Sequence, residues 1–431
     1  MKMKHLANGP DCMQCLGEAQ AFGGNPPHWA EAMAARPSGD LAFLDRATLV
    51  SRRCAAGLAA DADAPLLAAA TVAVADPALA QLAWYLHWRV FVAPEKGIPW
   101  GAPTLEPRLG PLAGAFYLLL SLEFPACLAA LHRQRGYPPE AATETSQQIA
   151  SYDGNHRRGR GCPGMYESQF PWLATYFTDP YVRLGRFEFQ LHGYGGGVSA
   201  WRRTWDGAVL ALAEEGTRVD AEGLRLRHDA PPAEGWTAHL AEEQTAVTGN
   251  PIVPTGQIMQ GTVRLDRREW RSCLRQGDIV LDLHIPAGGG MDWDSCVDSF
   301  RRALDFFSRY HPDKAFAAVV VSTWFMDPRL AELLPATANP LRLQRATYLH
   351  PTHPEPGGLW FVFLRPMAAP DPATLPRDTS LRRALAAFLD SGRTWHGGGM
   401  FLLREDMCEP CDGRYRQGFP DLCRELGLVP P

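Results

Sequence analysis

The chain has 431 residues, with 42 Lys and Arg against 47 Asp and Glu and a formal net charge of -5; this length suits two domains, and the lack of a basic stripe argues against a nucleic-acid partner. Its longest early apolar stretch, residues 68–75, is far shorter than the roughly 20 residues of a membrane span. Because the basic residues 1–4 lead into no apolar signal core, we expect a cytoplasmic protein without a membrane span.

The N-terminal part of the sequence predicts helices. Residues 40–131 are rich in Ala and Leu, and apolar side chains recur at helical spacing, as in Leu79, Leu82 and Leu86. We therefore expect a helical domain over residues 1–175. Within this domain the charged run at 155–161 predicts a solvated loop.

After residue 180 the apolar period changes to two, which predicts strands. Residues 182–191 place Glu188 on one face and Phe187 and Phe189 on the other. Further predicted elements are strands at 208–213, 279–285, 315–324, 341–349 and 359–364, a hairpin at 218–227, and helices at 292–310, 328–334 and 380–390. A strand, a crossover helix and a second strand in this order predict an α/β (α+β) domain over residues 176–405, in which a mixed sheet is flanked by helices and strands 279–285 and 315–324 are adjacent and parallel. Residues 406–431 then form a tail.

A glycine-rich turn, Ala287, Gly288, Gly289 and Gly290, joins the strand at 279–285 to the helix at 292–310. Free backbone N–H groups at such a junction suit a phosphate, and the helix dipole favours an anion there. Three glycines after a strand are equally compatible with a plain tight turn. Since neither a P-loop lysine nor a G-x-G-x-x-G run is present, the turn disfavours ATP and dinucleotides.

Polar residues occupy one face of the strand at 279–285. Alternation places Asp282 and His284 together on that face, although a central strand should be apolar on both. The two side chains are candidates for an acid/base pair in which the carboxylate orients the imidazole. The alternative is a structural histidine with a hydrogen-bonded ring at the end of a strand.

Two C-x-x-C pairs lie near the two ends of the chain: Cys12 with Cys15, and Cys408 with Cys411. This spacing lets two thiolates bind one tetrahedral zinc ion, and chain termini are often close in space. The pairs therefore predict a possible structural zinc site. The competing interpretation is that they are ordinary thiols.

Several short runs in the C-terminal half resemble those of a known family. They are His284-Ile285-Pro286, residues 296–299, Phe306-Phe307, His311-Pro312, residues 322–328, Asn339, Gln344 and residues 379–384, preceded by residues 181–189. Together they resemble the GNAT-like C-terminal domain of bacterial two-domain acyltransferases that have a helical N-acyltransferase N-terminal domain. This resemblance implies a GNAT core, an acyl thioester donor and an amine acceptor, and some relatives fatty-acylate peptides. One departure is that neither Arg nor Gln introduces the glycines at 287–290, so the donor is either acyl-CoA or an acyl carrier protein thioester.

Direct acyl transfer from a thioester to an amine requires a base, an oxyanion stabiliser and a proton donor for the leaving thiolate. We assign His284, assisted by Asp282, as the base and the strand backbone at 283–285 as the stabiliser. Candidates for the proton donor are Ser322, Thr323 and Tyr348. The alternative is a catalytically degenerate GNAT-fold protein that binds an acyl group or peptide without turnover.

Overall fold

The computed structural model describes residues 8–97, 100–179, 181–227, 229–231, 234–365, 367 and 371–429. The chain divides into two compact units. The first contains Met1–Leu184 and Ile285–Gly289, and the second contains Gly185–His284 and Gly290–Pro431.

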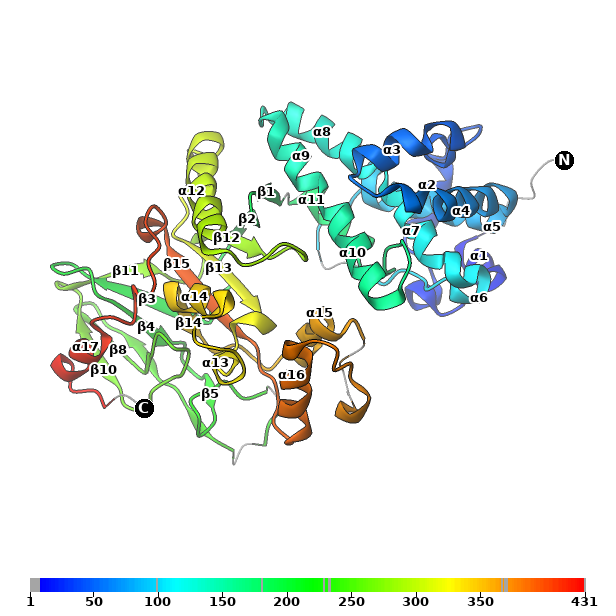
Figure 1. Cartoon of the computed structure of the whole chain (residues 1–431). Coiled ribbons are helices and arrows are strands. Elements are labelled where there is room, and N and C mark those ends of the chain that lie inside the picture. The colour runs from blue at the N-terminus through cyan, green and yellow to red at the C-terminus, as the bar shows by residue number, and fades with distance from the viewer. Residues whose placement is uncertain are drawn as a thin grey trace. The chain divides into compact units, whose positions relative to one another are not determined.

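Helices build the first unit, as the sequence predicts (Figure 1). They are α1 (Gly9–Cys15), α2 (Trp29–Ala34), α3 (Leu49–Ala55), α4 (Asp63–Ala75), α5 (Pro77–His87), α6 (Glu106–Leu109), α7 (Ala113–Ser121), α8 (Phe124–Gln134), α9 (Pro139–Ser146), α10 (Gln148–Arg160) and α11 (Thr175–Thr178), followed by the short strand β1 (Val182–Leu184). Asp76 begins α5 by accepting hydrogen bonds from the N–H groups of Ala78 and Leu79, and a proline occupies the first position of that helix.

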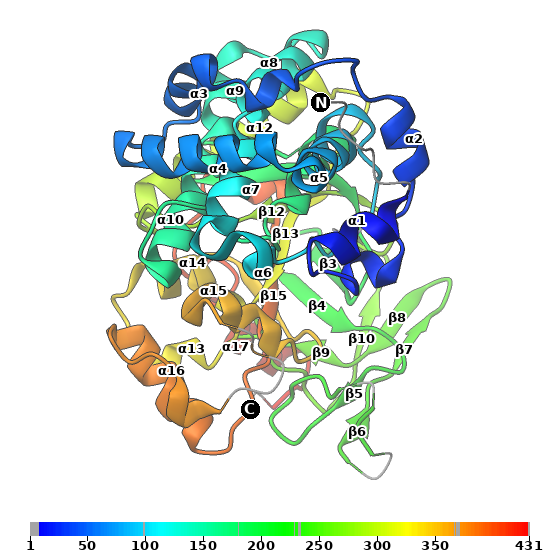
Figure 2. The same cartoon turned by 90° about the vertical axis from the view of Figure 1, so that its right-hand side faces the viewer.

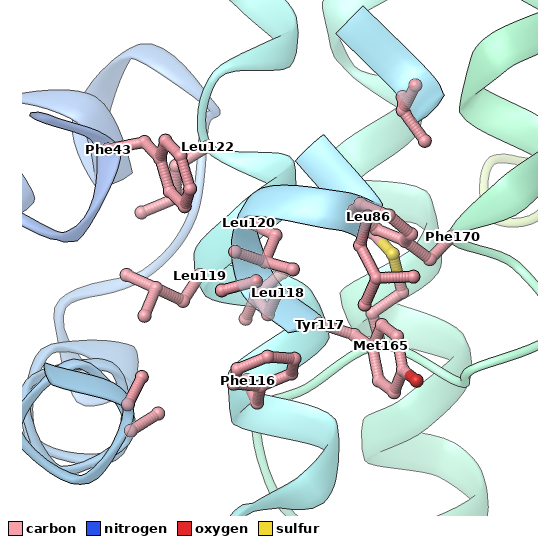
Figure 3. Close-up of a cluster of buried hydrophobic side chains, with 14 of the residues drawn as sticks. Phe43, Leu86, Phe116, Tyr117, Leu118, Leu119, Leu120, Leu122, Met165 and Phe170 are labelled. Atoms are coloured by element: carbon pink, nitrogen blue, oxygen red, sulfur yellow. The ribbon is translucent and has the colours of Figure 1, made fainter. Parts of the chain in front are cut away.

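Helix α7 lies at the centre of the helical core. Every one of its residues is buried, because its sequence AGAFYLLLS is apolar on nearly all sides. Figure 3 shows side chains of α7 packed with Leu86, Met165 and Phe170, which come from segments before and after it in the chain. The consequence is one continuous apolar core for the unit.

The stretch from Glu106 to Gln134 has the length and hydropathy of a membrane span. However, 67% of its most apolar window is buried inside the protein. A second such stretch, Ala60–Ala75 with Pro77–Val92, is bent by 110°. Core helices of a folded domain can have the same length and composition, and they are mostly buried, as this apolar window is.

The predicted loop at 155–161 is wrong, since α10 continues to Arg160. Arg157 explains the difference: its guanidinium forms ion pairs with Asp153, one turn earlier, and with Asp61. Gly161 then ends the helix with a φ of 75°, a left-handed conformation that glycine adopts without steric cost.

The second unit consists of sheets and flanking helices. Its elements are β2 (Phe187–Gly193), β3 (Val198–Arg203), β4 (Val209–Ala213), β5 (Arg218–Val219), β6 (Trp236–Thr237), β7 (Leu240–Glu242), β8 (Ala246–Gly249), β9 (Pro251–Ile252), β10 (Val263–Asp266), β11 (Trp270–Leu274), β12 (Ile279–His284), α12 (Trp293–Tyr310), β13 (Ala318–Thr323), α13 (Leu330–Leu333), α14 (Asn339–Ala346), β14 (Tyr348–His350), α15 (Trp360–Phe363), α16 (Ser380–Asp390), β15 (Gly398–Leu403) and α17 (Phe419–Glu425).

The central sheet of this unit has the strand order β2-β12-β13-β15-β14 (Figure 1). Strands β12, β13 and β15 of this sheet are labelled in Figure 2. Strands β12 and β13 are adjacent and parallel, which confirms the prediction, and the other pairs are antiparallel. Helix α12 joins these two strands and begins where expected, with Asp292 capping the N–H of Ser295. Its Phe300 packs on Phe187 and Phe189 of β2, so α12 covers that face of the sheet.

Some local predictions differ from the structure. The strand predicted at 341–349 is helix α14 followed by β14, and the strand predicted at 359–364 is the short helix α15. Pro340 stands at the start of α14, where proline favours a helix. The predicted strand at 182–191 is broken by Gly185, whose φ is 76°, into β1 and β2. Strand β15 was not predicted.

Residues beyond 405 pack against the sheets of the second unit. Phe419, Leu422 and Cys423 of α17 are buried in a cluster with Trp201 and Trp270. This C-terminal segment therefore contributes to a hydrophobic core.

Candidate active site

One row of residues crosses the central sheet at the ends of its strands. The register pairs Glu188 of β2 with His284 of β12, and pairs Gly399 of β15 with both Ser322 of β13 and His350 of β14. Continuing the parallel register of β12 and β13 brings His284 and Ser322 to the same level. Because Phe187 and Phe189 point to α12, Glu188 and the residues in its row lie on the opposite face.

His284 is held by a carboxylate. Its Nδ1 lies 2.7 Å from Oε2 of Glu188, a side chain with 0% exposure, whereas the imidazole is 25% exposed. If Nδ1 carries the proton that it donates to Glu188, Nε2 is the basic nitrogen. This arrangement orients a base and supplies the negative charge that stabilises an imidazolium.

Glu188 makes this contact with Nδ1, and the sequence did not predict it as the partner of His284. Asp282 lies two residues before His284 on the same strand and pairs in register with Gln190. The sequence did contain a signal for Glu188, because it lies on a polar strand face between Phe187 and Phe189. Its antiparallel pairing with His284 depends on the sheet.

The parallel strands β12 and β13 separate next to His284. Their ladder pairs Leu281 with Val319 and Asp282 with Val320, and within the described residues it does not reach the last two positions of β12. Ser322 is exposed beyond this point. An opening between two strands can expose backbone N–H groups, which is the feature that the predicted oxyanion stabiliser at 283–285 requires.

His350 approaches the row from its edge strand. The ring lies so close to Gly399 that a Cβ added there would be 2.1 Å from the imidazole Cε1. Only glycine fits opposite this ring. Burial lowers the pKa of His350 to about 4, so the ring is neutral at pH 7.

Tyr348 lies in the core and does not belong to this row of residues. Its hydroxyl donates to the carbonyl of Ile252 at 2.5 Å and accepts from the N–H of Ala211 at 3.2 Å. The side chain has 0% exposure and stacks on Phe401. Burial also raises the pKa of the hydroxyl. The prediction that Tyr348 protonates a leaving thiolate is therefore wrong, since its hydroxyl is already bonded on both sides.

Two residues of the family-like runs have a structural role. Asp327 accepts hydrogen bonds from the N–H groups of His396 and Gly397, directly before β15, and from the guanidinium of Arg329. The amide of Gln344 donates to the carbonyls of Phe325 and Asp327. These bonds fix the segment that follows β13 beside the start of β15.

The glycine turn has the open geometry that the sequence suggests. Gly288 and Gly289 have φ values of 82° and 62°, and a Cβ added to either would meet no atom within 4 Å. The first turn of α12 is less suited to an anion, because the carboxylate of Asp292 already accepts from the N–H of Ser295. Whether the turn contacts a ligand stays a prediction.

Two arginines that the sequence did not single out flank the start of α12. Arg186 donates through Nε to the carbonyl of Gly290 at 2.8 Å. The guanidinium of Arg342 on α14 lies 4.9 Å from the ring centre of Trp293. The cap bond from Ser295 lowers the pKa of Asp292, and Arg342 adds to the shift. Both guanidiniums therefore place positive charge beside the start of α12.

The structure does not support the predicted zinc site. Among the residues that the structure describes, no three His, Cys, Asp or Glu side chains are grouped as a metal ion requires. Cys12 is buried, its thiol donates to the carbonyl of Ala78, and burial raises the thiol pKa to about 12. Cys15, Cys408 and Cys411 are exposed free thiols.

The chain is similar to known proteins in both sequence and fold. A family model described as GNAT-like C-terminal domain matches residues 181–402. A crystal structure of an acyltransferase in complex with decanoyl-CoA and teicoplanin is 23% identical, with a TM-score of 0.59 over 91% of this chain and 98% of that chain. Another, of an acyltransferase in complex with CoA and 10C-teicoplanin, is 22% identical with a TM-score of 0.60 over the same shares. The search of curated proteins finds no match. At these identities the structural likeness shows the fold.

Proposed function

Because the chain belongs to the family of proteins with a GNAT-like C-terminal domain, we propose that it is an acyltransferase that moves an acyl group from acyl-CoA to an amine. The observation that carries this proposal is the contact of His284 with the buried Glu188 beside the separating strands β12 and β13. A base next to an opening in the sheet suits an amine that attacks a thioester.

The reaction requires that the amine loses one proton and that the leaving thiolate gains one. The amine nitrogen forms a bond to the thioester carbonyl carbon and loses a proton to Nε2 of His284, while Glu188 stabilises the imidazolium. The carbonyl oxygen becomes negative and is held by backbone N–H groups at 283–285. The C–S bond then breaks, and the thiolate takes a proton, for which Ser322 is the nearest candidate in the row. Asp282 adds negative charge to the same strand face.

Charge near α12 supports a phosphate-bearing donor. Arg186 and Arg342 lie beside the start of this helix, and the turn Ala287–Gly290 leaves room around its backbone. Acyl-CoA and an acylated carrier protein both carry phosphate next to pantetheine. The acyltransferase structures named above hold decanoyl-CoA or CoA, so we favour acyl-CoA.

For the acceptor we propose an amine on a peptide or glycopeptide. The same acyltransferase structures contain teicoplanin or 10C-teicoplanin, which motivates this class. The ten cysteines are free, and this fits a reducing compartment, so we propose that the reaction takes place in the cytoplasm.

A donor-dependent assay tests the proposal. The protein is incubated with decanoyl-CoA and a panel of amines and peptides, and free CoA thiol is measured together with the acceptor mass. We expect thiol release that depends on the acceptor and a mass gain of one decanoyl group. A parallel reaction with a decanoylated carrier protein distinguishes the two donors.

The second candidate function is the binding of an acyl group or peptide without turnover. It is favoured by Asp292, whose carboxylate occupies the helix start that a phosphate would use. If decanoyl-CoA binds but no acceptor releases thiol above the hydrolysis background, the acyltransferase proposal fails and the binding function replaces it.

A further inference from the structure

The helical unit contains a cavity that the proposed acyl transfer does not use. Residues of α8 and α9 and Ala55 of α3 line it, and it has a volume of about 400 Å³. Small-molecule sites in proteins commonly have volumes of roughly 300–1,000 Å³. The cavity is therefore large enough for a ligand of moderate size.

The cavity extends along α8 and has both apolar and polar lining. Along α8 its lining runs from Pro125 in the first turn through Ala129 to Arg133 in the last, a distance of roughly 12 Å for eight residues at about 1.5 Å each. Pro125, Ala129 and Ala142 give the cavity apolar lining, and His132 and Arg133 give it polar lining.

The side chain of His132 is buried without a hydrogen-bond partner. Its relative exposure is 1%, and neither ring nitrogen has a partner among the described residues. Burial lowers its pKa to about 4, with a smaller contribution from Arg135, so the ring is neutral and carries one donor and one acceptor. Buried polar groups are nearly always bonded, so this ring in a cavity wall indicates a missing polar partner.

Arg133 follows in sequence and also lines the cavity, with its side chain exposed. Among the described residues its guanidinium has no hydrogen bond, ion pair or ring contact. A guanidinium binds a carboxylate through two parallel hydrogen bonds, as Arg157 of this unit does with Asp61.

We propose that this cavity is a second ligand site that binds an amphiphilic carboxylate, a fatty acid of medium length, with its carboxylate on Arg133 and His132 and its tail along Ala129 and Ala142. The apolar lining removes the tail from water, and the two polar side chains hold the head group. This site goes beyond acyl transfer, since it binds the free acid without reacting with it.

Calorimetric titration of the full-length protein with decanoate tests the site. We expect one equivalent to bind, and octanoate and hexanoate to bind about fourfold more weakly for each methylene removed. Decanol, which lacks the charge, should bind at least tenfold more weakly. Equal binding of decanol and decanoate would overturn the carboxylate assignment.

Variants locate the binding. Arg133→Gln and His132→Phe should each weaken decanoate about tenfold, and Ala129→Phe should abolish binding by filling the cavity. Arg46→Gln, an exposed arginine elsewhere in the same unit, and His284→Ala should leave binding unchanged. The titration is repeated with protein saturated with decanoyl-CoA. If decanoate binding persists in Ala129→Phe or is lost with decanoyl-CoA, the ligand lies in the acyl-transfer site and the proposal is wrong.

Discussion

Two histidines of this chain, in its two units, are held in opposite ways. His284 lies at the end of a strand, partly exposed, with its Nδ1 on a fully buried carboxylate. His132 lies near the end of a helix, almost fully buried, with both nitrogens lacking a partner. The first arrangement orients the ring beside a carboxylate and suits proton transfer. The second keeps the ring neutral and suits binding.

The comparison shows that burial alone does not identify a functional histidine. His87, His132 and His350 all have pKa values lowered to about 4 by burial, yet only His350 lies in the row that contains His284. The partner of the ring decides what it can do. The following experiments test this distinction, beginning with the largest expected effect.

Replacing His284 by Ala should lower turnover with decanoyl-CoA by about 10²- to 10⁴-fold, the range for loss of a general base. Donor affinity should change little, because the imidazole is not needed to bind the thioester. Steady-state kinetics and donor titration measure the two effects. His192→Ala, an exposed histidine on the neighbouring strand β2, is the matched control. A destabilised His284→Ala variant with full turnover would make this histidine structural.

Replacing Glu188 by Gln keeps the shape of the side chain but removes its charge. Turnover should fall by about 10- to 100-fold, because the imidazolium formed during proton transfer loses its partner. The same assay with Asp282→Asn determines which carboxylate assists the base. An effect that appears only in Asp282→Asn would return the role to the residue that the sequence predicted.

Arg186→Gln and Arg342→Gln should each raise the apparent dissociation constant of decanoyl-CoA about tenfold, because each change removes roughly one charge-assisted contact with the phosphates. The Michaelis constant of the acceptor should stay nearly unchanged, because the phosphates belong to the donor. Arg275→Gln, an exposed arginine of the same unit, serves as the control. Unaltered donor binding in both variants would move the phosphates away from α12.

Acid should destabilise the wild-type protein through its buried histidines. The folded-state pKa of His132, about 4, is below the ordinary 6.5, so the unfolded chain binds more protons between these values. The free energy of unfolding therefore has its full value above about pH 6.5 and decreases as the pH falls toward 4. Between pH 7 and pH 5 the free energy of unfolding should therefore fall by about 1–2 kcal/mol less in His132→Phe than in the wild-type protein. Urea titrations at both values measure the difference, and equal losses would contradict the neutral, unpartnered ring.

At pH 8 the same His132→Phe change should raise the free energy of unfolding by about 1 kcal/mol, because it removes two unsatisfied buried nitrogens and keeps the ring contact with Tyr137. The melting temperature should rise by about 2–4 °C. If instead the variant melts lower by that amount, His132 has a polar partner in solution.

Local patterns in the sequence determined the elements that carry strong periodicity. The alternation in 279–285, the cap at Asp292 and the apolar stripe of α12 depend on neighbours in the chain, and strand β12, helix α12 and strand β13 followed as expected. The helical character of the first unit has the same origin. His284 was identifiable for this reason, as a polar residue on a strand that should be buried.

Only the tertiary structure decided the partners of these residues. Glu188 is 96 positions from His284, and their contact depends on the antiparallel register of β2 and β12. Arg186 and Arg342 reach the start of α12 from a turn and from a helix that the sequence predicted as a strand. The spacing of the cysteine pairs could not establish a zinc site either, since spacing describes neighbours along the chain and coordination requires them to meet in space, and the described residues show no such group. Side-chain chemistry is encoded residue by residue, whereas the distances that make a site arise from long-range packing.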